Sequence, residues 1–399
     1  MKKNSDKKIE EVLTRAVETI FPAKDGLKKM LKEKKIRLYL GVDPTSPRLH
    51  LGHTVPLRKL KEFQELGHEA ILLFGTFTAQ IGDPSDREEA RKPLTLNQVK
   101  ENMATYKKQA SKIIDFSKIK IKYNGDWLSK LNLEDVIKLA SNFTVSRLLE
   151  RDMFQKRLKE GKEVWVSEFL YPLLQGYDSV AMNVDLEIGA TDQTFNILVG
   201  RKLQEVYNKK EKFVLTTPML IGLDGRKMSK TYNNTVNLTD SPIEMYGKIM
   251  SLRDELIIHY FQLVTSLPLE EIRKIEDNLK RKKINPRDAK SRLAREITTL
   301  FHGKKEALFA EKEFNKVFRD NETPFEIPEI RIKKGNVNIL DLLVKTKMVS
   351  SKSEAKRLIL QKGIRINKAI QDDWRKIIKP KGGEIIQAGK RKFVKLLKS

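Results

Sequence analysis

The sequence predicts an α/β fold with a doubly wound parallel sheet, followed by an α-helical domain and a small α+β domain. Three observations predict it. From residue 36 to residue 217, short apolar segments alternate with longer amphipathic ones, as strands and helices do in a parallel sheet. After residue 237, successive helical patterns replace the strand-like segments. Residues 337–399 then mix short helical and strand-like segments.

The first region contains candidate strands separated by helical stretches. A helical pattern covers residues 9–34 and is interrupted near Pro22. Amphipathic patterns predict further helices, for example over residues 57–66 and 194–206. The candidate strands are residues 38–42, 70–74, 119–123, 184–188 and 213–217. We expect a Rossmann-like sheet, in which ligands bind at the carboxyl ends of the strands.

The later regions divide into two further domains and a linker. The helical domain begins with Ser241-Pro242-Ile243-Glu244, a capping-box pattern with proline at the first helical position. Residues 323–336 contain two prolines and no clear periodicity, which indicates a linker. The last region has helical patterns over 339–346 and 351–361 beside strand-like IRIN, GGEIIQAG and RKFVKLL. The predicted domains are therefore residues 1–236, 237–322 and 337–399.

The charge of the chain indicates a polyanionic partner. Its 399 residues carry 79 Lys and Arg against 53 Asp and Glu, a net charge of +26. Residues 337–399 hold 17 of the basic residues and only 5 acidic ones. Solubility, or attraction to an acidic membrane surface, is the alternative explanation. Cysteine is absent, which excludes disulfides, thiolate catalysis and cysteine-based zinc sites.

The N-terminus and the hydropathy of the chain bear on its location. The opening MKKNSDKKIEE is charged and lacks the apolar core of a signal peptide. No apolar run is as long as about 18 residues, the length that a membrane-spanning helix needs. We expect a cytoplasmic protein without a membrane partner.

Two segments have the composition of a phosphate-binding site. In the first, the strand at 38–42 leads into a helix through Gly41, Gly52 and the histidines His50 and His53. Glycine permits close approach and a helix start attracts anions, so this junction suits a phosphate chain. An ordinary strand-to-helix turn with surface histidines is the alternative.

The second segment is the glycine-opened loop 225–234, which carries Lys227 and Lys230 after the last candidate strand. Lysine is a mobile point charge that suits a departing polyphosphate. A solvated lysine loop is the alternative. The HLGH segment and the KMSK segment, in this order, resemble the paired motifs of class I aminoacyl-tRNA synthetases.

The segments between these motifs resemble the tyrosyl-tRNA synthetase family in particular. They are YLGVDPTSPRLHLGH (39–53), GTFTAQIGDPS (75–85), SEFLYPLLQGYDS (167–179), GATDQ (189–193) and GRKMSKT (225–231). The resemblance implies a tyrosine–tRNA ligase of bacterial type, an ATP-dependent, AMP-forming enzyme of protein biosynthesis. It would convert L-tyrosine and ATP to tyrosyl-adenylate and pyrophosphate, and then transfer the tyrosyl group to the 3′ end of tRNA(Tyr).

The resemblance also implies a tyrosine site. Tyr39 and Asp178 would meet the phenolic hydroxyl of the substrate; a strand aromatic and a helix-surface acid are the alternatives. Tyr171, Gln175 and Asp178 are spaced i, i+4 and i+7, which puts them on one helix face. The α-ammonium group would be held by Tyr171, Gln175, Asp83 and Thr78, and the carboxylate region by Gln193. Asp83 in Gly82-Asp83-Pro84 could equally be a plain turn residue.

The ATP site implied by the resemblance combines the two phosphate segments. Gly41, Asp43 and Gly52 would shape it, and Asp192 would bind the ribose, although Asp192 could instead be a simple helix N-cap. The phosphates would be met by Thr45, His50, His53, Lys227, Lys230 and Thr231. Mg²⁺ would accompany ATP through phosphate oxygens, and we expect no metal held tightly by protein ligands. Zinc at the histidines is disfavoured because no third ligand stands at a characteristic spacing.

The last domain resembles a small RNA-binding domain. Its residues Lys352, Lys356, Arg357 and Lys362 would contact the phosphate backbone of tRNA, and a solvated basic helix is the alternative. Members of the family are homodimers. Competing functions are a tryptophanyl-tRNA synthetase, a small-molecule nucleotidyltransferase, and a synthetase-like RNA-binding protein without catalysis.

Overall fold

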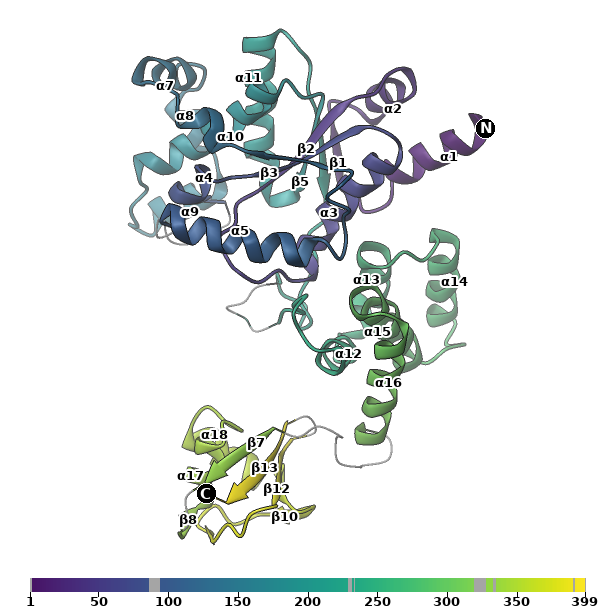
Figure 1. Ribbon diagram of the computed structural model, residues 1–399, viewed down its shortest axis with the longest axis vertical. Helices are drawn as coiled ribbons and strands as arrows, with labels where there is room; N and C mark the ends of the chain where they lie inside the picture. The colour runs from purple at the N-terminus through teal and green to yellow at the C-terminus, as the bar shows by residue number, and fades with distance from the viewer. Residues whose placement is uncertain are drawn as a thin grey trace. The chain divides into compact units, whose positions relative to one another are not determined.

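The computed structural model describes residues 2–85, 94–228, 232, 234–318, 328–332, 335–389 and 392–398. Its Cα positions fall into two compact units, Met1–Ala307 and Leu308–Ser399 (Figure 1). Within the described residues, the first unit contains a six-stranded sheet and most of the helices, and the second contains a smaller sheet. Each unit is described separately.

The sheet of the first unit is doubly wound, as the sequence predicts. Its strand order is β1-β6-β5-β2-β3-β4, and β6, β5, β2, β3 and β4 run parallel to their neighbours. From β2 the chain runs through β3 to β4 at one edge and then returns to β5 and β6 on the other side of β2, the order of a doubly wound sheet. The strands are β1 Thr19–Phe21, β2 Arg37–Val42, β3 Glu69–Phe74, β4 Lys120–Tyr123, β5 Leu186–Ala190 and β6 Phe213–Thr217.

The N-terminal segment differs from its predicted helix. Two helices, α1 Lys2–Val12 and α2 Lys24–Glu33, flank β1, which pairs antiparallel with β6, so the sheet is mixed. A three-residue strand is defined by its partner and not by local periodicity, which explains why the pattern over 9–34 was misleading. The strand predicted at 184–188 lies two residues later, as β5.

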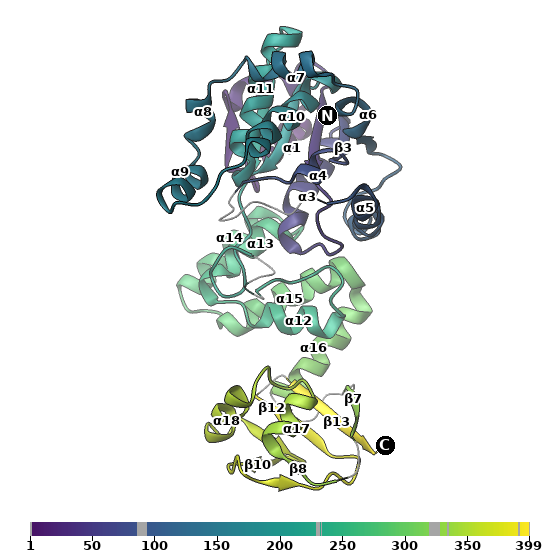
Figure 2. The same ribbon diagram turned by 90° about the vertical axis from the view of Figure 1, so that its left-hand side faces the viewer.

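Four long helices cover the sheet. α3 Leu51–Glu65 packs on β2, β3 and β5, and α5 Leu96–Ala110 precedes β4. α10 Val166–Met182 and α11 Thr194–Asn208 lie side by side near β5 and β6 (Figure 2). Shorter helices complete this part: α4 Thr78–Ile81, α6 Gly125–Leu128, α7 Leu133–Ala140, α8 Val145–Leu149, α9 Asp152–Lys159 and the 3₁₀ turn η1 Thr191–Gln193.

The predicted helical region is present and begins where expected. The side chain of Ser241 accepts from the Glu244 N–H, and Pro242 occupies the first turn. The Arg15 guanidinium, after α1, donates to carbonyls at the end of α13, including that of Leu267 at 2.7 Å. The helices are α12 Pro242–Met250, η2 Asp254–Leu256, α13 Ile257–Val264, α14 Leu269–Lys280, α15 Pro286–His302 and α16 Lys304–Phe318. None of the described helices is long and apolar enough to span a membrane.

The second unit is built on a sheet with the order β10-β9-β12-β13-β7 and a separate pair of β8 with β11. Its apolar core includes Ile339, Leu342, Ile359, Ile386 and Val394. β7 lies inside the segment that the sequence indicated as a linker. This short strand is defined by its parallel pairing with β13, which is distant in the sequence, and not by a local pattern. The elements are β7 Glu329–Ile332, β8 Val337–Asn338, α17 Ile339–Lys345, α18 Lys352–Leu360, β9 Ile364–Ile366, β10 Ala369–Gln371, β11 Ile377–Ile378, β12 Ile385–Ala388 and β13 Lys392–Lys398.

Candidate active site

The predicted site residues of the first unit gather at the carboxyl ends of the parallel strands. Asp43 follows β2, Thr78 follows β3, and Asp192 and Gln193 follow β5. This edge is where an open α/β sheet offers a crevice for ligands. α10 lies across it and contributes Tyr171, Gln175 and Asp178, which confirms that these three residues share one helix.

Asp178 is a buried carboxylate with two N–H donors. Its Oδ1 accepts from the indole Nε1 of Trp127 at 2.8 Å, and its Oδ2 accepts from Nδ2 of Asn124 at 3.2 Å. Burial raises the pKa of Asp178 well above its ordinary value, and the two donors oppose that shift. No sequence motif pointed to Asn124 or Trp127, although both directly follow the predicted strand β4.

Tyr39 is a fully buried residue of β2. Its hydroxyl lies 3.0 Å from Oγ of Ser179, the residue after Asp178. Burial, followed by the nearby carboxylate of Glu187, raises the pKa of Tyr39 well above the ordinary value, so its phenol stays protonated. Tyr39, on β2, therefore contacts α10 at the residue next to Asp178. The joint contact of Tyr39 and Asp178 with a substrate hydroxyl stays a prediction.

Asp43 connects the strand β2 with α10 and α4. Its Oδ2 accepts from the Tyr171 hydroxyl at 2.9 Å, and its Oδ1 accepts from Thr78 Oγ1 at 2.7 Å. Asn124 Nδ2 donates to the same Thr78 oxygen at 2.9 Å and so joins this group to Asp178. A Cβ at position 75 would lie 1.8 Å from Asp43 Oδ1, so Gly75 makes the arrangement possible. Asp43 is thus tied to the predicted tyrosine residues as well as shaping the junction.

A second group joins Asp83 to Gln175 through an asparagine that the sequence did not indicate. Gln193 Nε2 donates to Asp83 Oδ2 at 2.7 Å. Nδ2 of the buried Asn196 lies 3.0 Å from Gln175 Oε1 and 3.2 Å from Gln193 Oε1. Asp83 Oδ1 also accepts from the Ser85 N–H, which is the turn contact weighed as its alternative role. Both roles are therefore compatible.

The two histidines lie at the start of α3, with His50 at the N-cap. His53 Nδ1 accepts from the His50 N–H at 3.1 Å, and the two ring centroids are 3.9 Å apart. A neutral ring that accepts at Nδ1 carries its proton on Nε2 and is a hydrogen-bond donor at that nitrogen. A Cβ at Gly52 would lie 3.0 Å from the His50 ring, whereas Gly41 is exposed. Thr45 lies in the turn after β2, where its N–H donates to the Asp43 carbonyl.

The lysine loop returns to the histidine segment. His50 forms a backbone bridge with Asn237, and the Leu51 N–H donates to the Val236 carbonyl at 2.9 Å. Lys227 Nζ lies 3.6 Å from Asp192 Oδ2, which brings a predicted phosphate ligand beside the predicted ribose ligand. Lys230 and Thr231 lie outside the described residues.

Asp192 lies within η1 and not at the start of α11. The N-cap position of α11 is Gln193, so the alternative of a simple N-cap for Asp192 is wrong. The part of the chain that the structure describes contains no cluster of three His, Asp or Glu side chains able to hold a metal ion.

Comparisons with known proteins agree with these motifs. A family model for tRNA synthetases class I (W and Y) matches residues 31–319, and one for the tyrosine–tRNA ligase SYY-like C-terminal domain matches residues 321–396. The tyrosine–tRNA ligase of Thermotoga maritima is 49% identical over 387 residues, 97% of this chain and 96% of that protein. The chain belongs to the tyrosyl-tRNA synthetase family.

Two further relatives of this family member support the assignment. The tyrosine–tRNA ligase of Carboxydothermus hydrogenoformans is 47% identical over 398 residues, 97% of each chain. Among solved structures, a C-terminally truncated mitochondrial tyrosyl-tRNA synthetase of Coccidioides posadasii has a TM-score of 0.62 at 26% identity. That match covers 77% of this chain and 91% of the other.

In the second unit of this family member, the four predicted RNA-contacting residues are exposed on or after α18. Lys352 Nζ forms an ion pair with Asp341 at 2.7 Å, which compensates part of its charge. Lys356 Nζ lies 4.2 Å from the ring centroid of Trp374, and the Arg375 guanidinium lies 4.8 Å from it. The sequence did not indicate Trp374 or Arg375, which are distant from α18 along the chain.

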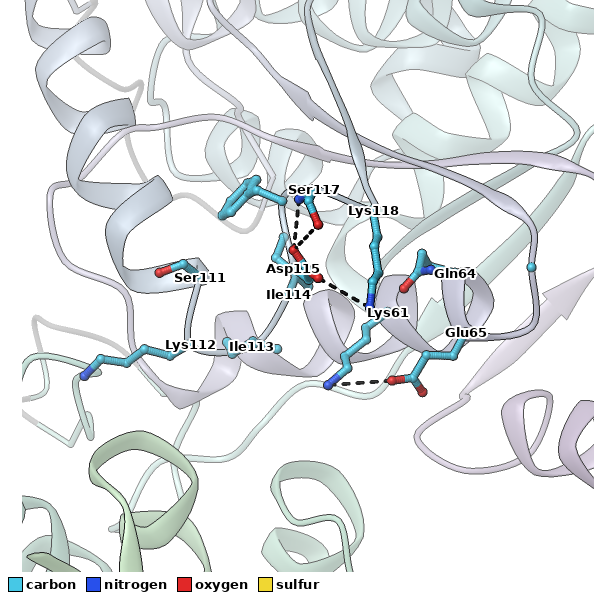
Figure 3. Close-up of a pocket in the computed structure, with 12 residues that line it drawn as sticks. Lys61, Gln64, Glu65, Ser111, Lys112, Ile113, Ile114, Asp115, Ser117 and Lys118 are labelled. Carbon is cyan, nitrogen blue, oxygen red and sulfur yellow. Dashed lines mark hydrogen bonds and ion pairs between the residues drawn. The ribbon is translucent and has the colours of Figure 1, made fainter.

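An open pocket lies away from this site, beside the end of α3 and the turn after α5 (Figure 3). Its lining includes Lys61, Glu65, Lys112, Asp115 and Lys118. Asp115 accepts from the N–H and the hydroxyl of Ser117 and pairs with Lys118, so the acid holds a surface turn. None of the predicted site residues lines this pocket.

Proposed function

We propose that this protein activates L-tyrosine with ATP and transfers the tyrosyl group to tRNA(Tyr). The observation that carries the proposal is Asp178, a buried carboxylate held by Trp127 and Asn124 beside the Tyr39 hydroxyl. A phenol that donates to this carboxylate completes its hydrogen bonding, whereas the ring of phenylalanine would leave a buried polar group without that partner. An indole N–H could donate to Asp178, but an indole has no oxygen to pair with the Tyr39 hydroxyl, so the pair favours a phenol.

The chemistry needs no enzyme nucleophile. The carboxylate of tyrosine attacks the α-phosphate of ATP, the bond to pyrophosphate breaks, and negative charge moves onto the departing phosphates. His53, as a donor at Nε2, and Lys227, beside the ribose ligand Asp192, would stabilise that charge. A hydroxyl of the tRNA 3′ end then attacks the carbonyl of tyrosyl-adenylate and releases AMP. Catalysis is mainly the positioning of reactants.

Mg²⁺ enters this scheme as part of the ATP substrate, bound through phosphate oxygens and water. The ribose would be held by Asp192, and the α-ammonium group by Tyr171, Gln175, Asp83 and Thr78. The exposed cations of α18 would contact the tRNA backbone without reading its sequence. We propose that this work takes place in the cytoplasm.

We also propose a homodimer. Large apolar side chains are exposed on the short helices α7 and α8 and at the start of α10: Leu133 is 75% exposed, Ile137 56%, Val145 65% and Val166 75%. Leu133 and Ile137 are four residues apart on α7 and so share a face. Apolar side chains gathered on a surface commonly mark a protein interface. A second copy of this chain is the partner that the family supports.

The decisive experiment is tyrosine-dependent exchange of labelled pyrophosphate into ATP. We expect exchange with tyrosine, much less with phenylalanine, and much less with tryptophan. Folded protein that gives no exchange with any amino acid would support the RNA-binding alternative instead. Exchange that is fastest with tryptophan would move the chain to the other branch of its family.

A further inference from the structure

A buried ion pair lies behind Tyr39, and the proposed reaction does not use it. Lys212 is 0% exposed and Glu187 is 2% exposed, and their side chains are in contact. Lys212 Nζ lies 5.9 Å from the centroid of the Tyr39 ring. Burial lowers the pKa of Lys212, and the Glu187 carboxylate opposes that shift. A buried pair of charges adds little net stability, so its presence beside the tyrosine pocket calls for a functional reason.

Ser179 joins this pair to Tyr39. Lys212 Nζ donates to Ser179 Oγ at 2.7 Å, and the same oxygen lies 3.0 Å from the Tyr39 hydroxyl. Ser179 Oγ also donates to Glu187 Oε2 at 3.3 Å. Tyr39 and Glu187 are partners on the neighbouring strands β2 and β5, so their side chains leave the sheet on the same face. Ser179 reaches that face from α10.

The hydroxyl of Ser179 holds this group together. An ammonium group only donates, so Ser179 Oγ accepts from Lys212. A carboxylate only accepts, so the serine gives its own proton to Glu187. The same serine oxygen lies within hydrogen-bond distance of the Tyr39 hydroxyl. The buried ion pair therefore fixes the serine, and the serine fixes the position of the Tyr39 hydroxyl.

We propose that Lys212, Glu187 and Ser179 are positioning residues that hold the Tyr39 hydroxyl in place for the phenolic hydroxyl of tyrosine. The proposal rests on the proposed function. The pocket then presents two fixed polar groups, the Asp178 carboxylate and the Tyr39 hydroxyl, to a substrate that brings a hydroxyl of its own. The charged lysine strengthens the chain of hydroxyls because hydrogen bonds in series polarise one another.

Ser179→Ala is the sharpest test, because it removes the connecting hydroxyl and leaves the ion pair in place. We expect the dissociation constant for tyrosine, measured by equilibrium dialysis, to rise about three- to tenfold, the effect of removing one hydrogen bond. The affinity for phenylalanine, measured by competition, should stay the same because phenylalanine has no hydroxyl group to pair with Tyr39. The KM for ATP should also stay the same.

A second variant addresses the pair itself. Lys212→Met alone would leave Glu187 buried without a counter-charge and endanger folding, so both residues are replaced, as Lys212→Met with Glu187→Met. We expect the same selective loss of tyrosine affinity. The matched control is Arg157→Met with Glu168→Met, another buried ion pair, which connects α9 with α10 through hydrogen bonds that do not include Tyr39. The control should leave tyrosine affinity unchanged.

Three results would overturn the positioning role: unchanged tyrosine affinity in Ser179→Ala, equal losses for tyrosine and phenylalanine, or an equal loss in the control pair. Failure of the proposed function is separable from these. Unmodified protein that binds tyrosine but gives no pyrophosphate exchange would contradict the reaction alone, because the affinity comparison still decides the positioning role. Unmodified protein that does not bind tyrosine would overturn both.

Discussion

Burial of the Asp178 carboxylate costs free energy, and we propose that the same group recognises the hydroxyl of tyrosine. The variant Asp178→Asn keeps the size of the side chain but turns one acceptor oxygen into a donor, which then faces an N–H of Trp127 or Asn124. Hydrogen bonds to a charged group contribute about 1.5–3 kcal/mol, so tyrosine affinity should fall about ten- to a hundredfold. Equilibrium dialysis measures this change. Tyrosine affinity within about twofold of the unmodified protein, a free-energy change well under that of one hydrogen bond, would contradict the role of Asp178.

The same variant should also change how stability depends on pH. Burial raises the pKa of Asp178, so this group stabilises the folded state while it is protonated, and that contribution is lost as the pH rises from about 4 through its raised pKa. The amide that replaces the carboxyl group in Asp178→Asn does not titrate. Urea unfolding should therefore show the unmodified protein losing stability relative to the variant over this rise. The exposed Glu134→Gln on α7 is the control, and its pH profile should parallel that of the unmodified protein.

At the scale of single residues, the sequence located the side chains with recognisable motifs and missed their supports. Asp43, Tyr171 and Thr78 were predicted, and the structure joins them directly. Asn124, Trp127 and Asn196 were not, because an asparagine or tryptophan after a strand has no distinctive spacing. Lys212 and Glu187 were missed for a related reason. From the sequence alone, a charged residue at a strand is expected to be exposed, because the sequence does not show the partner that would allow its burial.

At the scale of elements, periodicity predicted the long helices and the central strands. β2, β3, β4 and β6 lie within one residue of their predicted bounds. β2, β3 and β6 are largely buried and form apolar runs, as parallel strands covered on both faces do, whereas β4 at the sheet edge alternates exposed and half-buried residues. The strands missed by the sequence, β1, β7, β8, β10 and β11, have four residues or fewer. Such strands depend on pairing with distant segments. Local sequence therefore carries little information about them.

The exposed apolar face of α7 leads to a test of the proposed dimer. Leu133→Asp with Ile137→Asp puts charge on this face without disturbing a core, because both side chains are exposed. We expect sedimentation to show a monomer at concentrations where the unmodified chain is a dimer, with little change in unfolding by urea. Leu360→Asp on α18, at a side chain 61% exposed, is the matched control and should leave the dimer intact. A double variant that remains dimeric would place the interface elsewhere.

At the scale of the whole molecule, the boundary of the second unit decides where the chain can be cut. Removal of residues 334–399 would leave β7 without its partner β13, and the unit boundary lies earlier still, at Leu308. A chain ending at Phe318 avoids this because it keeps α16 complete and removes every strand of the second sheet. The uneven charge of the sequence predicted that this region is separate in function, but not that its sheet begins before residue 337.

The chain ending at Phe318 should separate the two steps of the proposed reaction. Every predicted tyrosine and ATP residue lies in the retained part, so tyrosine-dependent pyrophosphate exchange should be nearly unchanged. Charging of tRNA should weaken, and its dependence on salt should become shallower, by about 0.7–0.9 in log–log slope for each phosphate that the shortened chain no longer neutralises.

Substitutions in the full chain test the same role. The triple variant Lys356→Gln, Arg357→Gln and Lys362→Gln should reproduce part of both effects. The control variant Lys29→Gln with Lys61→Gln, at exposed lysines of the first unit, should not. Loss of pyrophosphate exchange in the shortened chain would mean that the second unit supports the first step, and equal salt slopes before and after the cut would show that the second unit does not bind the tRNA backbone.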